Sequence, residues 1–76
     1  MNLLEYTKLR IIAYEKGAKN IEIYDNSLII EYRNHLDIDI NLLKKYSRRF
    51  NHFPDDKKIV IYSSNPEKSL FKIFNS

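Results

Sequence analysis

The sequence predicts a small α+β domain in which helices cover a three-stranded sheet, in the order α-β-β-α-β-α. Three segments place apolar residues at helical spacing, three shorter ones are rich in Ile, Val, Leu and Tyr, and polar turns separate them. One Gly, two Pro and 43% hydrophobic residues are typical of a packed core and not of a linker. We find no internal repeat and no domain boundary, so we expect residues 1–76 to form a single small domain.

The first half of the chain predicts a helix and a β-hairpin. The helix covers residues 2–16, and Gly17 stands where a helix ends. Its apolar residues recur with a period near 3.6: Leu3, Leu4, Tyr6, Leu9, Ile12 and Ala13. Alternating residues over 21–24 and 28–33, with turn chemistry at 25–27, predict a hairpin with one face toward the core.

The second half predicts a helix, a strand and a last helix. The helix covers about residues 40–50, with Asp37 or Asp39 as its N-cap. Its apolar residues are Leu42, Leu43, Tyr46 and Phe50. A short extra strand over 50–53 is the alternative to a three-stranded sheet. Apolar residues on both faces of 58–62 predict a central strand. Asn65-Pro66-Glu67 predicts the start of the last helix, with a buried stripe of Leu70, Phe71, Ile73 and Phe74.

Composition narrows the class of protein. The chain has no cysteine, so a secreted disulfide scaffold has no support. Neither a signal-peptide pattern nor an apolar run of about 20 residues is present. We therefore expect a soluble, cytoplasmic protein that does not contact membranes.

Basic residues gather in one quarter of the chain. Between residues 44 and 58, six basic residues stand against two acidic ones: Lys44, Lys45, Arg48, Arg49, Lys57 and Lys58. Like charges four residues apart on a helix repel, which an anionic partner would relieve. These residues are the candidate interaction patch, with Tyr46 and Phe53 nearby as candidate stacking groups. The competing interpretation is an ordinary solvated face at a helix C-terminus.

The sequence contains no pattern typical of a catalytic site or a metal site. His35, Asp37 and Asp39 are too few ligands for an oxygen-rich or zinc site, and the two Asp residues suit a turn and a helix cap. His52 has no nucleophile or acid at a meaningful spacing, and Ser63 and Ser64 lack a glycine elbow. A chain with Gly17 as its one glycine cannot form a phosphate-binding loop. We therefore predict no cofactor, no metal, no small-molecule substrate and no enzyme activity.

The order of these segments resembles that of a known protein family. Leu9-Arg10 and Ala13 on a helix lead through a glycine into the strand at 21–24, and a leucine-rich helix with a basic end follows over 42–49. This resembles the C-terminal segment of the bacterial transcription-repair coupling factor, a large ATPase that removes stalled RNA polymerase. The family's upstream Asp-Arg-Phe-Gly-type signature is absent, so the chain would represent the distal half of that C-terminal regulatory domain.

The resemblance implies a regulatory role. In this family the C-terminal domain packs on a module similar to the excision-repair helicase subunit and masks its docking surface. The expected partners are therefore other domains of a parent protein, and the helicase motor would lie elsewhere. A different class remains open: a stand-alone small basic protein that holds nucleic acid weakly through the basic helix.

Overall fold

The structure is an α+β domain, as predicted, but its sheet has one more strand than the sequence indicated. Residues 2–46 and 49–75, which the computed structural model describes, form three helices and four strands. These are α1 (Leu3–Glu15), β1 (Ala18–Ile23), β2 (Ser27–Tyr32), α2 (Ile40–Tyr46), β3 (Arg49–Phe53), β4 (Lys58–Tyr62) and α3 (Pro66–Phe74). No helix in these two ranges is long and apolar enough to cross a membrane.

The sheet joins two hairpins through their inner strands. The strand order is β1-β2-β4-β3, and every neighbouring pair is antiparallel. β4 lies between β2 and β3, which confirms the predicted central position of residues 58–62. In the middle of the sheet, Ile30 lies opposite Ile59 and Leu28 opposite Ile61. These cross-strand pairs fix which side chains of the four strands point to the same side.

Two predictions, the helix over 40–50 and the three-stranded sheet, were wrong because of the segment Arg49–Phe53. α2 ends at Tyr46, and Arg49–Phe53 forms β3, which was the alternative for this segment. β3 pairs with β4, and Phe50 lies opposite Ile61 and packs, partly buried, against the core. A ladder of hydrogen bonds and the burial of Phe50 outweigh the helical spacing of the apolar residues before it.

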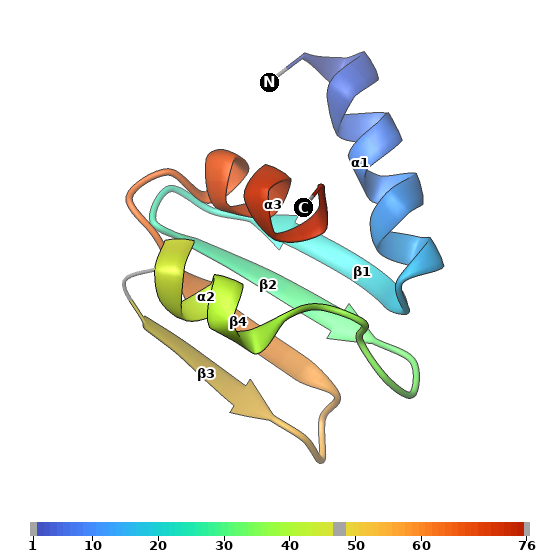
Figure 1. Cartoon of the computed structure of the whole chain (residues 1–76), viewed down its shortest axis with the longest axis vertical. Coiled ribbons are helices and arrows are strands. Elements are labelled where there is room, and N and C mark those ends of the chain that lie inside the picture. The colour runs from blue at the N-terminus through green and yellow to red at the C-terminus, as the bar shows by residue number, and fades with distance from the viewer. Residues whose placement is uncertain (1, 47–48, 76) are drawn as a thin grey trace.

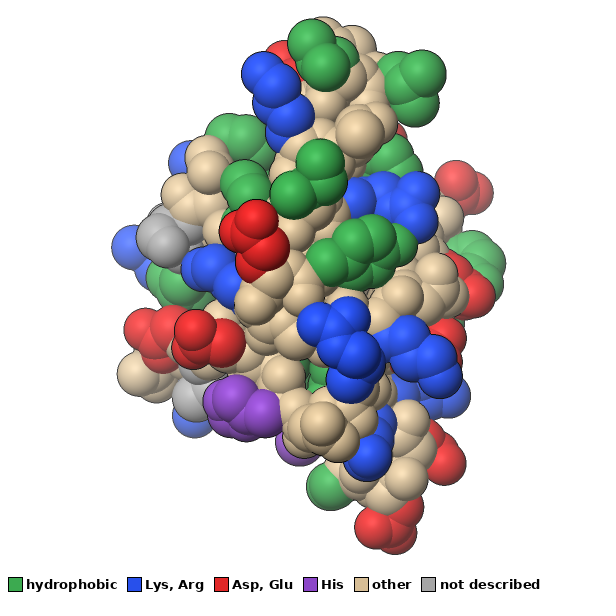
Figure 2. Space-filling view, turned by 90° about the vertical axis from the view of Figure 1, so that its right-hand side faces the viewer, with side chains coloured by type: hydrophobic (Ala, Val, Ile, Leu, Met, Phe, Trp, Pro, Cys, Tyr) green, Lys and Arg blue, Asp and Glu red, His purple; other side chains and the backbone are tan. Residues whose placement is uncertain are grey.

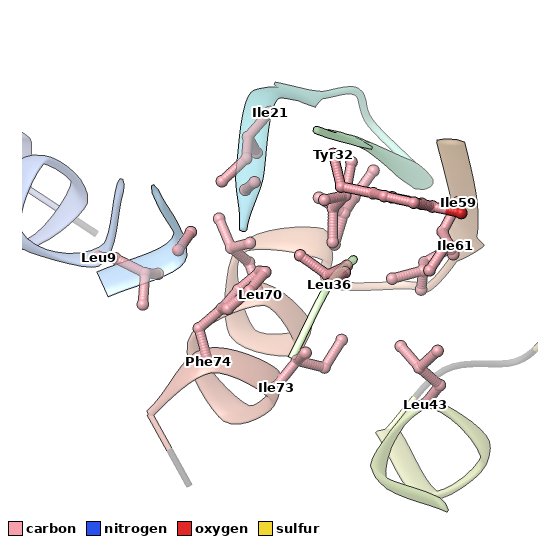
Figure 3. Packing of buried hydrophobic residues seen from close by; sticks show 14 residues of the cluster. Leu9, Ile21, Tyr32, Leu36, Leu43, Ile59, Ile61, Leu70, Ile73 and Phe74 are labelled. Atoms are coloured by element: carbon pink, nitrogen blue, oxygen red, sulfur yellow. The ribbon is translucent and has the colours of Figure 1, made fainter. Parts of the chain in front are cut away.

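The core lies between one face of the sheet and the helices. Figure 1 shows α2 and α3 in front of the same face, with α1 beyond the β1 edge. Leu70, Ile73 and Phe74 of α3 lie in the middle of the cluster, between Ile21 on one side and Ile59 and Ile61 on the other (Figure 3). Leu43 enters from α2 and Leu9 from α1.

The predicted stripe of α3 was correct except at Phe71. Leu70, Ile73 and Phe74 are almost completely buried, whereas Phe71 is 43% exposed. Phe71 lies about 100° around the helix from Leu70, because an α-helix turns once every 3.6 residues. This rotation takes the ring out of the buried stripe.

Side-chain caps define the helix ends that the sequence indicated. The amide of Asn41 donates to Asp39 Oδ1 at 2.9 Å at the start of α2. The amide of Lys68 donates to Asn65 Oδ1 at 3.1 Å at the start of α3. Gly17 follows α1 with a positive φ of 109°. The predicted roles of Asp39, Asn65 and Gly17 are therefore confirmed.

Candidate interaction surfaces

One face of the sheet has no helix over it among the described residues. Side chains alternate along a strand, so the neighbours of the buried residues point away from the helices. We call these side chains the open sheet face: Asn20, Glu22, Ser27, Ile29, Glu31, Arg49, Asn51, Phe53, Lys58, Val60 and Tyr62. All of them are exposed or partly exposed. The open sheet face therefore offers a continuous surface of four strands.

The β3–β4 half of this face pairs cations with aromatic rings. The guanidinium carbon of Arg49 lies 4.5 Å from the centroid of the Tyr62 ring. At the other end of the hairpin, Lys58 Nζ lies 5.7 Å from the centroid of the Phe53 ring. Each pair sits directly across the two strands, so the β3–β4 register creates both contacts. Both distances are within the range in which a cation is attracted to a ring face.

The β1–β2 half of the face is acidic. The side-chain amide of Asn20 lies 3.4 Å from carboxylate oxygens of both Glu22 and Glu31. The Tyr24 hydroxyl donates to Glu22 Oε2 at 2.8 Å. This hydrogen bond and the nearby negative charge raise the pKa of Tyr24, because both disfavour the phenolate. The open sheet face is thus divided into an acidic half and a half with cations and rings.

The structure separates the predicted basic residues. Lys44 and Lys45 are exposed on α2, in the helix layer, whereas Arg49 and Lys58 lie on the open sheet face. Lys57 lies in the β3–β4 turn with a φ of 52°. Arg48 and the side chain of Tyr46 lie outside the described residues. The described members of the predicted patch therefore belong to two faces, and their role in binding remains a prediction.

A second candidate surface lies on α1. Leu9 and Ala13 are buried, but Leu3 is 80%, Leu4 63% and Ile11 53% exposed. We call Leu3, Leu4 and Ile11 the α1 apolar surface. Figure 2 shows hydrophobic side chains across the upper part of the molecule, where α1 extends past the sheet.

A cleft adjoins the α1 apolar surface. It has a volume of about 430 Å³ and lies between the start of α1, the end of β1 and the start of α3. Its lining residues are Asn2, Leu3, Tyr6, Ile23 and Glu67.

The sequence interpretation missed the α1 apolar surface because it counted Leu3 and Leu4 among the residues at helical spacing and gave Ile11 no role. In a helix with a single buried stripe, the opposite side is polar. In α1, apolar residues occur on both sides, since Ile11 is exposed while Leu9 and Ala13 are buried. An apolar pattern around the whole helix was the available signal for a second contact surface.

His52 and Ser63, considered above as candidate catalytic residues, form hydrogen bonds with structural partners. Tyr32 Oη and His52 Nε2 are 2.6 Å apart, and their rings are in contact. The Ser63 and Ser69 hydroxyls are also 2.6 Å apart, and Ser63 Oγ accepts from the amide of Asn65. Ser63 thus belongs to the capping loop of α3, as predicted. In the described part of the chain, no three His, Asp or Glu side chains gather in a group that could hold a metal ion.

The candidate surfaces stand on geometry alone, because comparison with known proteins adds no relative. No family model, no curated protein and no solved structure matches the chain. Membership of the coupling-factor family accordingly remains a prediction from the sequence.

Proposed function

We propose that the chain is a non-catalytic interaction module that docks onto another protein surface through the α1 apolar surface. The exposure of Leu3, Leu4 and Ile11 on a folded helix carries this proposal. Contiguous apolar surface that a folded domain leaves exposed marks protein contact sites. The adjoining cleft, with Tyr6 and Ile23 among its lining residues, extends the contact area toward α3.

We place this module in a coupling-factor-like protein of the cytoplasm, as the resemblance implies. The succession of a helix, a hairpin, a second helix, further strands and a final helix supports this assignment. The partner is then another domain of the parent protein, the module similar to the excision-repair helicase subunit. A contact of only a few kcal/mol can be displaced by a competing partner, which suits a regulatory switch.

A binding measurement tests the docking proposal. The full chain is titrated against the purified repair-helicase-like module of a coupling factor from the same organism, by isothermal calorimetry. Leu4→Ser and Ile11→Ser should each weaken binding roughly tenfold, because each removes apolar area from the contact. Phe53→Ser is the matched control, since Phe53 is also an exposed apolar side chain but lies on the open sheet face. Equal affinity for all four proteins, or no binding, would contradict the proposal.

The family assignment has its own test. The reading frame upstream of Met1 should continue into an Asp-Arg-Phe-Gly-type segment and a helicase motor. In such a parent protein, Leu4→Ser combined with Ile11→Ser should weaken the intramolecular contact and raise nucleotide turnover. A stop codon directly upstream of Met1 would rule out the parent protein. The hypothesis of a nucleic-acid-binding protein that uses the basic helix would then take its place.

A further inference from the structure

Beyond the proposed docking role, we infer that the β3–β4 half of the open sheet face binds single-stranded nucleic acid by base stacking. The observation behind this inference is the pairing of a cation with an aromatic ring at each end of one hairpin. Arg49 covers Tyr62, and Lys58 lies over Phe53. None of these four side chains is buried.

The spacing of the two pairs fits a strand that runs along the hairpin. Arg49 and Phe53 are four residues apart on β3, which is about 14 Å at 3.4 Å per residue. Two different nucleotides would therefore contact the two pairs. Between them lie Asn51 and Val60, which face each other across β3 and β4. The Asn51 amide can donate to and accept from a base edge, and Val60 provides an apolar floor.

The chemistry of the pairs matches both parts of a nucleotide. Bases stack on aromatic rings and on the plane of an Arg guanidinium, and this contact accepts every base. Phosphates are drawn to Arg49 and Lys58, and the exposed Lys57 in the adjoining turn adds a third cation. A duplex keeps its bases stacked inside, so it could use the cations but not the rings. The ligand chemistry is thus that of a single strand.

The acidic half of the face limits where the strand lies. Glu22 and Glu31 repel phosphates, so the nucleotides are confined to β3 and β4. Glu31 also sits directly opposite Lys58 in the β2–β4 register and offsets part of its charge. Binding should consequently be weak, micromolar or weaker, and should fall as salt rises.

A protein partner on this face is less favoured by the same observations. An acidic peptide would satisfy Arg49 and Lys58 but would make no particular use of the Phe53 and Tyr62 rings. The two rings with their cations therefore favour nucleotides, whose bases and phosphates use both kinds of group.

The test uses the full chain and a labelled oligothymidine about 12 nucleotides long, followed by fluorescence anisotropy. Phe53→Ser should weaken binding roughly 5- to 150-fold, the loss expected for one stacked base. Phe71→Ser is the matched control, since Phe71 is 43% exposed and Phe53 41%, and Phe71 lies on α3. Circular dichroism of each variant establishes that the fold is kept.

Charge variants separate stacking from simple attraction. Arg49→Gln should weaken binding and reduce its salt dependence, whereas Lys68→Gln, an exposed lysine on α3, should change it little. Glu31→Gln should tighten binding, because it removes the carboxylate opposite Lys58.

Three results would overturn the inference: no binding at low salt, equal loss for Phe53→Ser and Phe71→Ser, or equal affinity for a duplex of the same length. Self-association that Phe53→Ser abolishes, without oligonucleotide binding, would assign the face to a second copy instead. None of these results bears on docking through Leu4 and Ile11, which the separate titration decides.

Discussion

Gly17 occupies a position where a side chain has neither the conformation nor the space it needs. Its φ is 109°, in the region that residues with a Cβ rarely adopt. A Cβ built on Gly17 would lie 2.0 Å from the carbonyl oxygen of His35. The Gly17 carbonyl also accepts from the amide of Arg33 at 3.1 Å. The glycine therefore lets the end of α1 and the segment after β2 approach closely.

Gly17→Ala should lower the free energy of unfolding by roughly 2–4 kcal/mol, through backbone strain and the clash with His35. Urea denaturation measures the change. Lys19→Ala is the control on the neighbouring strand, where the side chain is exposed and an effect within about 0.5 kcal/mol is expected. A loss below about 1 kcal/mol for Gly17→Ala would mean that the segment around His35 moves aside at little cost.

Single residues show what could be predicted locally and what could not. The position of Gly17 after a helix was predictable, because the lack of a Cβ permits a positive φ. Its contact with His35 was not predictable, because the two residues meet only through the tertiary fold. Phe53 was recognised as a candidate stacking group from its neighbourhood in sequence. Its pairing with Lys58 required the β3–β4 register.

At the scale of the elements, β3 is the segment whose structure its own sequence pattern did not predict. Leu42 and Leu43 establish a helical spacing that Phe50 continues, and the sequence predicted a helix through residue 50. In the structure Phe50 packs against the core from a strand, so the spacing was coincidental. The pairing that stabilises β3 comes from β4, which follows a turn. Elements whose stability comes from a later segment are poorly predicted from their own residues.

The start of α3 was predictable because its capping residues act within one helical turn. Asn65→Ala should cost about 1 kcal/mol of stability, since the amide of Lys68 loses its acceptor. The loss should reach the whole domain, because α3 carries Leu70 and Phe74 into the core. Asn65→Asp should keep nearly full stability, because Asp is an equally good N-cap. Thermal or urea denaturation that shows the same loss for both variants would exclude capping as the cause.

On the scale of the whole molecule, the described helices cover one face of the sheet and leave the open sheet face uncovered by described residues. The residues of the open sheet face therefore contribute little to the core, and a domain of 76 residues has few other sources of stability. The start of α1 is weakly anchored, since the buried residues of this helix, Leu9 and Ala13, lie at its middle and near its end. β2 and β4 occupy the centre of the sheet and each contributes alternating buried residues. Stability should accordingly be uneven across the molecule.

Amide hydrogen exchange should reveal this unevenness. We expect the amides of β2 and β4 to exchange only through global unfolding. The amides in the first half of α1 should exchange through a local opening that costs roughly 2 kcal/mol less than global unfolding. The side chains of Leu3 and Leu4 are exposed, so this opening breaks few buried contacts. Exchange followed by NMR at increasing urea distinguishes local opening from global unfolding. Local opening exposes little surface, so its free energy depends weakly on denaturant. Equal protection of α1 and β4 would contradict this expectation.

The same measurement connects stability to docking. A partner that covers the α1 apolar surface should raise protection in the first half of α1 and leave β4 close to its free value, because binding stabilises the closed form of the helix. A nucleotide strand on the open sheet face should instead protect β3, the edge strand that carries Arg49 and Phe53. The pattern of added protection therefore distinguishes the two surfaces on the folded, unmodified chain.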